Sequence, residues 1–206
     1  MALSDRGLGI LLVTGSAVAW STAGLFTRFL TADAATMLMW RGTFGALGLM
    51  SVLLLRDGRA GLAGFARLGP PGWLYAAVSA AGMLCFITAL TRTSVAHVAV
   101  IYAAAPFLAA GLGWLLLGER PGGRALTAAM LALGGASVMV GLSADGTLGG
   151  DLLALGMTLA MALMMVIARR WPTIPTLPAA TLSALMSSLA VLPLASLALP
   201  EPGQMV

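Results

Sequence analysis

Seven stretches of the chain are apolar over about the length that an α-helix needs to cross a bilayer, and short connections join them. A helix rises about 1.5 Å per residue, so roughly 20 residues span the hydrocarbon core. A soluble core has no use for so many uninterrupted apolar runs. The sequence therefore predicts an all-α, polytopic membrane protein with seven transmembrane helices, at residues 8–29, 34–55, 72–90, 95–117, 125–142, 152–168 and 178–199.

Arginines cluster in every second connection, which predicts the orientation of the chain. With a cytoplasmic N-terminus, the inner connections hold eight of the eleven basic residues, the outer ones hold two, and Arg41 lies within a span. The opposite orientation would invert this count and violate the positive-inside rule. We therefore expect a multi-pass protein with the N-terminus in the cytoplasm and the end of the seventh span outside.

The composition excludes other classes of protein and of partner. With 60% apolar and 9% charged residues, the chain falls outside the range of ordinary globular domains. The net charge of +4 is explained by arginines at anionic lipid headgroups, and no basic run with interleaved aromatics suggests nucleic acid. The lone cysteine, Cys85, lies inside the third span and excludes both an internal disulfide and a cysteine metal cluster.

A weak internal repeat accompanies this pattern. Shifting the chain by 141 residues aligns 9–28 with 150–169 and gives six identities, which include Gly15 with Gly156 and Arg28 with Arg169. Five spans precede the acidic, glycine-rich segment 143–151 and two follow it. An odd number of spans per repeat makes the second copy enter the membrane from the opposite side, as in the inverted repeats of secondary transporters.

Arg41 is the most informative charge, because it lies about a third of the way into the second span. An arginine at the centre of a span costs about 2.5–3.5 kcal/mol on insertion scales, so it should face a polar cavity or a partner rather than lipid. One interpretation is a group that faces an anion near the outer mouth of a pathway. The other is a side chain that reaches the headgroups or bonds to helix carbonyls.

Two further pairs of residues mark the middle of spans. Trp20 lies at midplane depth, although tryptophans favour the interfaces, and Ser21 follows it. Trp20 could stack on a substrate in a central cavity or pack between helices, and the sequence leaves both roles open. Pro106 lies at the centre of the fourth span, where its missing N–H leaves the Tyr102 carbonyl without its helical partner. A kink is expected there, as a hinge, a cavity wall or a purely structural feature.

The remaining polar residues suggest no catalytic chemistry. Glu119 and Arg120 are interpreted as a capping ion pair rather than a gate, and His97 as an interfacial hydrogen-bonding group rather than a proton carrier. No Asp or Glu lies in the interior of any span, and the chain has no GxSxG, HExxH or P-loop motif. The sequence predicts neither an enzyme nor a bound metal or cofactor.

Several motifs resemble the EamA-domain transporters of the drug/metabolite transporter superfamily. They are AWSTAGLFTRFL with Trp20, WRGTFGAL with Arg41, the stretch 89–120 with its proline and closing Gly-Glu-Arg, and GGASVMVG in the fifth span. The resemblance implies a ten-helix fold of two inverted five-helix repeats that moves small metabolites, such as amino acids, through a central cavity by alternating access. It divides the chain into a first repeat at 7–142, an extracytoplasmic linker at 143–151 and two helices of a second repeat at 152–199.

The resemblance therefore implies a secondary transporter, exporter or importer, that binds a small-molecule substrate and lies in the lipid bilayer of a bacterial inner membrane. Its expected cavity is bounded by Trp20, Ser21, Arg41, Tyr102 and Pro106, with substrates anionic or zwitterionic rather than cationic. Because three helices of the second repeat are missing, we expect a fragment, or a chain completed by another chain or by dimerisation. The alternative is a non-transporting membrane scaffold or assembly partner, or an inactive fragment.

Overall fold

The computed structural model describes residues 7, 9–11, 13–19, 33–119, 122–140 and 146–195. The chain divides into two compact units, one of residues 1–32 with 198–206 and one of Asp33–Leu197. In the first unit the described residues form a helix within Gly9–Ala19. The remainder of the predicted first span, which includes Trp20 and Ser21, lies outside the described residues.

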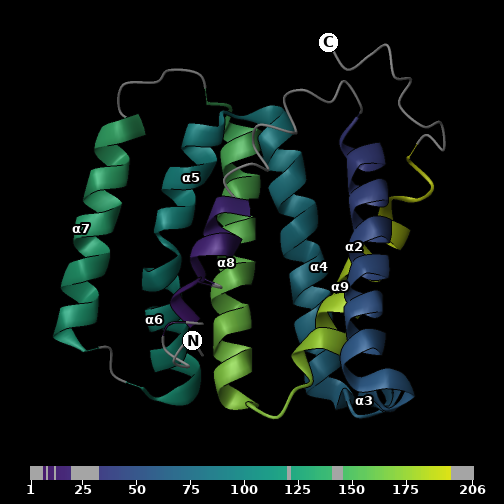
Figure 1. Cartoon of the computed structure of the whole chain (residues 1–206). Helices are drawn as coiled ribbons and strands as arrows, with labels where there is room; N and C mark the ends of the chain where they lie inside the picture. The colour runs from purple at the N-terminus through teal and green to yellow at the C-terminus, as the bar shows by residue number, and fades with distance from the viewer. Residues whose placement is uncertain are drawn as a thin grey trace. The chain divides into compact units, whose positions relative to one another are not determined.

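Every element described in Asp33–Leu197 is helical, which confirms the predicted all-α class (Figure 1). Helices long and apolar enough to cross a membrane lie at Ala34–Ala66, Gly69–Arg92, Val95–Leu117 and Leu148–Arg170. The elements are α2 (Ala34–Asp57), the 3-10 helix η1 (Gly58–Leu62), α3 (Ala63–Ala66), α4 (Gly69–Arg92), α5 (Val95–Ala103), α6 (Ala105–Leu117), α7 (Gly123–Val140), α8 (Leu148–Arg170) and α9 (Thr176–Val191).

Local chemistry explains where these helices begin. Asp33, Ser94 and Thr147 precede α2, α5 and α8, and each side chain accepts a hydrogen bond at 3.2 Å from the backbone N–H three residues later. Such caps satisfy donors that have no partner within the helix. The hydroxyl of Thr36 also donates to Asp33, and these bonds lower the pKa of the Asp33 carboxyl.

Helix boundaries differ from the expected spans in several places. Residues 56–71, between the second and third expected spans, are mostly helical, because η1 and α3 continue directly from α2. α8 begins at Leu148, inside the predicted linker 143–151, since Thr147 caps it there. α9 has 16 residues and ends at Val191, before the predicted end of the seventh span, so it is shorter than the roughly 20 residues that cross a bilayer.

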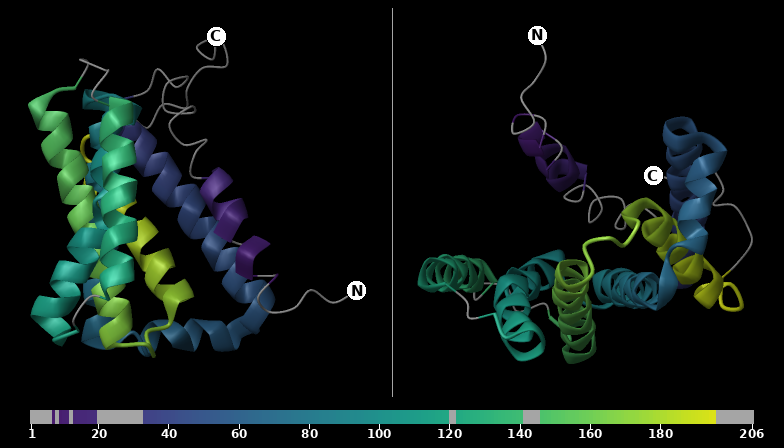
Figure 2. Two further views of the ribbon diagram at one scale, coloured as in Figure 1. Left: turned by 90° about the vertical axis from the view of Figure 1, so that its left-hand side faces the viewer. Right: turned by 90° about the horizontal axis from the view of Figure 1, so that it is seen from below.

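Helices from the end of the chain lie among those from its beginning. α8 packs against α4, α5 and α6, while α9 packs against α2 and α4, and α7 contacts α5 and α6. Figure 2 shows the row that results, in which α8 separates α4 from α5. We name its two ends by their residues: the linker end carries Arg92, Thr147 and Asp151, and the arginine end carries Arg56 and Arg169.

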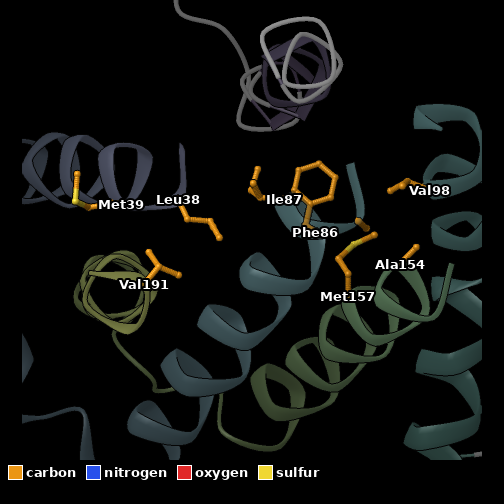
Figure 3. Packing of buried hydrophobic residues seen from close by; sticks show 9 residues of the cluster. Leu38, Met39, Phe86, Ile87, Val98, Ala154, Met157 and Val191 are labelled. Carbon is orange, nitrogen blue, oxygen red and sulfur yellow. The ribbon is translucent and has the colours of Figure 1, made fainter. Parts of the chain in front are cut away.

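The buried core lies where five of these helices meet. Leu38 and Met39 of α2, Phe86, Ile87 and Ala89 of α4, Val98 of α5, Ala154 and Met157 of α8, and Val191 of α9 form one cluster (Figure 3). Close packing of this kind holds helices together in lipid, where exclusion from water contributes little to their association. The cluster therefore joins the helices before and after segment 143–151 into one compact unit.

Candidate functional site

Arg41 lies on the second turn of α2, within the apolar segment Ala34–Ala66. Its guanidinium Nη1 donates to the thioether sulfur of Met83 on α4. A thioether is a weak acceptor, and a guanidinium has five N–H donors. In the described part of the chain no carboxylate pairs with Arg41, since the carboxylates that form ion pairs there, those of Asp57, Glu119 and Asp151, bind other residues.

The neighbour of Arg41 also carries a hydrogen-bond donor. Trp40 stacks on Phe44, with ring centroids 5.5 Å apart and planes 22° apart. Among the residues that the structure describes, the buried indole Nε1–H of Trp40 has no hydrogen-bond partner. A buried donor without an acceptor is uncommon in folded proteins and requires an explanation. This part of α2 therefore offers a cation and an indole N–H side by side in sequence.

Pro106 interrupts the fourth span, as the sequence predicts. α5 ends at Ala103, Ala104 separates the two helices, and Pro106 lies in the first turn of α6. The Ala104 N–H bonds to the Ile101 carbonyl at 3.1 Å, a bond one residue shorter than the α-helical pattern. The side chain of Tyr102, in the last turn of α5, is exposed. The break thus divides this span into two helical segments that meet at Ala104.

The structure describes three of the five predicted cavity residues, and it does not bring them together by contact. Arg41 lies on α2, which packs against α9 and α4, whereas Tyr102 and Pro106 lie on α5 and α6, which pack against α8 and α7. Trp20 and Ser21 belong to the residues outside the description. A cavity shared by the five side chains stays a prediction.

A seam of hydroxyl groups on α9 was not anticipated from the sequence. The Ser188 hydroxyl donates to the Met39 carbonyl at 2.9 Å and lies 2.9 Å from the Thr43 hydroxyl. Ser183 donates to the Ser79 hydroxyl of α4 at 2.8 Å. The sequence signal was available, since Ser183, Ser187 and Ser188 recur along an otherwise apolar span. Such side chains hydrogen-bond across helices in membranes, so the seam fixes α9 against α2 and α4.

Polar contacts also join α8 to the fourth span at both of its ends. At the arginine end, Arg169 of α8 donates to Glu119 at 2.8 Å, beyond the C-terminus of α6. At the linker end, Asp151 of α8 accepts from Thr93 and lies beside the His97 ring. From the sequence, Glu119 was expected to pair with Arg120, which lies outside the described residues, and His97 had no assigned partner. Neither partner on α8 was predicted, because each lies 50 or more residues away along the chain.

Other chemistry has no visible support in the described residues. No group of three or more His, Cys, Asp or Glu side chains there could hold a metal ion. Cys85 is a free thiol inside α4, and its sulfur would lie 3.3 Å from a Cβ added at Gly156. The ion pairs among the described residues lie near helix ends, whereas Arg41 lies within a span.

Comparison with known proteins gives one finding. A family model described as the EamA-like transporter family matches residues 7–141. This segment begins one residue before the first predicted span and ends just after α7, so it contains Arg41, Tyr102 and Pro106. Neither the curated proteins nor the solved structures contain a match.

Proposed function

Since this chain belongs to the EamA-like transporter family, of the drug/metabolite transporter superfamily, we propose that it moves amino acids or related metabolites across a bacterial inner membrane by alternating access. Its family membership makes the chain a small-molecule transporter, and its apolar helices make it a multi-pass membrane protein. The substrate class, the cavity and the inner-membrane location are our proposal. We further propose that the substrate is anionic or zwitterionic.

Arg41 carries the substrate proposal. A cation within an apolar span needs a compensating partner, because transfer of an unpaired charge from water costs several kcal/mol. Within the described residues its side-chain acceptor is the sulfur of Met83, and the other N–H groups of the guanidinium have no acceptor there. A carboxylate would accept two parallel N–H bonds from the guanidinium. Trp40 lies next to it in sequence and supplies a further donor.

The break at Ala104 supports the alternating-access part of the proposal. Transporters bind solutes where helices are interrupted, and the interruption lets part of a span move relative to the rest. α5 and α6 meet at such a break, and Tyr102 lies beside it with an exposed side chain. The proposed pathway involves Arg41 of α2 and this broken span, and the cavity predicted from Trp20, Ser21, Arg41, Tyr102 and Pro106 stays part of the proposal.

Uptake by reconstituted vesicles tests the proposal. Purified protein in liposomes is expected to take up radiolabelled glutamate or leucine faster than lysine. Arg41→Ala should weaken uptake by about 10- to 100-fold at low solute, as a lost charged hydrogen bond of about 1.5–3 kcal/mol implies. Arg67→Ala, at an exposed arginine outside the apolar spans, serves as the matched control. Equal uptake of lysine, or an unchanged rate in Arg41→Ala, would refute the anion-facing role.

A scaffold is the second candidate, because the hydroxyls of Thr43, Ser188 and Ser183 are engaged in packing rather than turned to a solute. Single cysteines at positions 41 and 102, in a Cys85→Ser background, separate the two functions. Reaction with a small charged thiol reagent, slowed by an amino-acid mixture, would establish a water-filled and occupied pathway. Unreactive thiols at both positions would favour a dry bundle and the scaffold.

A further inference from the structure

Three segments of the chain meet on one carboxylate at the linker end. The Thr93 hydroxyl, just after α4, donates to Asp151 Oδ1 at 2.9 Å. The His97 ring, in the first turn of α5, places Nδ1 3.2 Å and 3.3 Å from the two oxygens of the same carboxylate. Because an ionised carboxylate only accepts hydrogen bonds, Nδ1 carries the proton that faces it. Asp151 thereby ties the start of α8 to α4 and α5.

The backbone around this contact is closely fitted. The Thr147 hydroxyl donates to the Arg92 carbonyl, which adds a second bond between the same two segments. Gly146 lies against the His97 ring, with no space for a Cβ. A Cβ at Gly150 would lie 2.5 Å from Thr93 Cβ. The side chains of His97 and Asp151 are 17% and 31% exposed, so the pair is shielded from solvent but not sealed from it.

Histidine is the group whose charge decides the strength of this contact. Of the described elements packed against α5, α4 brings Arg92, which takes part through its carbonyl, and α8 brings Asp151. α6 has no ionisable side chain, and α7 has Arg124 at its opposite end. A protonated imidazole forms an ion pair with the Asp151 carboxylate, whereas a neutral ring offers that carboxylate a hydrogen bond without the charge.

We propose that His97 and Asp151 form a pH-sensitive latch that holds the linker end of α8 against α4 and α5. Protonation of His97 closes the latch by converting a hydrogen bond into an ion pair. Loss of that proton weakens it, and the start of α8 then separates more often from α5. The latch stands on these contacts alone and does not depend on which solute the protein carries.

Val98 provides the probe, because it lies beside His97 in sequence, is 3% exposed and packs in the core cluster with Ala154 and Met157. The full-length protein with Cys85→Ser and Val98→Cys is labelled in membranes with a charged maleimide between pH 5.5 and pH 8. Leu148→Cys, 80% exposed at the same end, corrects for the pH dependence of thiol reactivity. The ratio of the two labelling rates reports the opening of the latch.

The ratio is expected to rise about fivefold or more from pH 5.5 to pH 8, and to stay flat in His97→Gln and Asp151→Asn proteins. A flat ratio in the protein with His97, or an equal rise in His97→Gln, would overturn the latch. If Val98→Cys does not fold, Ala154→Cys replaces it, since Ala154 is fully buried one turn from Asp151 on α8. The same two outcomes then decide.

Discussion

At the scale of single residues, the absence of a side chain sets how closely helices approach. At Gly42 of α2, an added Cβ would lie 2.6 Å from the Ala184 carbonyl oxygen and 2.8 Å from Ser188 Cβ. At Gly48 of the same helix it would meet nothing within 4 Å. Helices in lipid associate through backbone approach of this kind. Gly42 is therefore a contact residue, and Gly48 is not.

We predict that Gly42→Ala destabilises the protein and Gly48→Ala does not. The first change forces α2 away from α9, and overpacking of this type costs about 1–3 kcal/mol. The second adds a better helix former without a clash, worth up to about 1 kcal/mol. Unfolding in detergent, followed by far-UV circular dichroism, measures both. Equal stabilities for the two variants would show that α2 and α9 are not in close contact.

Ser188 and Ser187 make a second matched pair. Ser188 bonds to Met39 and Thr43 across the helix interface, whereas Ser187 bonds to the Ala184 carbonyl of its own helix. Ser188→Ala is expected to cost about 0.6–1.7 kcal/mol, as measured for hydrogen bonds between membrane helices. Ser187→Ala should cost less. The same unfolding assay decides, and a larger loss at Ser187 would contradict the role assigned to the seam.

At the scale of elements, Pro106 divides the fourth span into two helices. The proline ring excludes the N–H that would continue the ladder, and α5 accordingly stops at Ala103. The sequence predicted this break because it depends on one residue and its own backbone. The packing of α5 against α8 depends on residues far along the chain, and it was not predicted from the sequence.

Replacing Pro106 by alanine should straighten this span. Residue 106 then regains a backbone N–H that can bond to the Tyr102 carbonyl, so the ends of α5 and α6 move apart. Spin labels at the exposed positions Ala96 and Leu116 would report a longer separation by pulsed electron resonance. Pro70→Ala, in the first turn of α4, is the control, because a proline there costs no helical bond. An unchanged separation in Pro106→Ala would remove the hinge.

At the scale of the whole molecule, orientation is the property that the arginine distribution predicts. The arginine end should face the cytoplasm. Single cysteines at Ala60 and Thr173, in a Cys85→Ser background, should be protected from an impermeant thiol reagent applied outside, and Leu148→Cys should react. All three positions are exposed, so burial does not confuse the result. The inverse labelling pattern would show that the chain has the opposite orientation in the membrane.

The five predicted cavity residues show which parts of the candidate site could be predicted from the sequence. Arg41 and Pro106 stand out from one span alone, since a charge or a proline within an apolar run needs no other segment to be noticed. The Met83 partner of Arg41 was not predicted, because a methionine among 13 has no distinctive pattern. The contribution of Trp20 and Ser21 stays a prediction.

By itself, the sequence determined the all-helical membrane class, most helix positions and the break at Pro106, because apolar length, capping groups and proline act within a few residues. Only the tertiary structure decided that α8 lies between α4 and α5, that α9 packs on α2, and that His97 and Glu119 pair with α8. The physical reason is that lipid solvates one apolar span about as well as another, so hydropathy does not decide which spans pack together. Their neighbours are chosen by small-residue contacts and interhelical hydrogen bonds, such as those of Gly42 and Ser188, which hydropathy does not record.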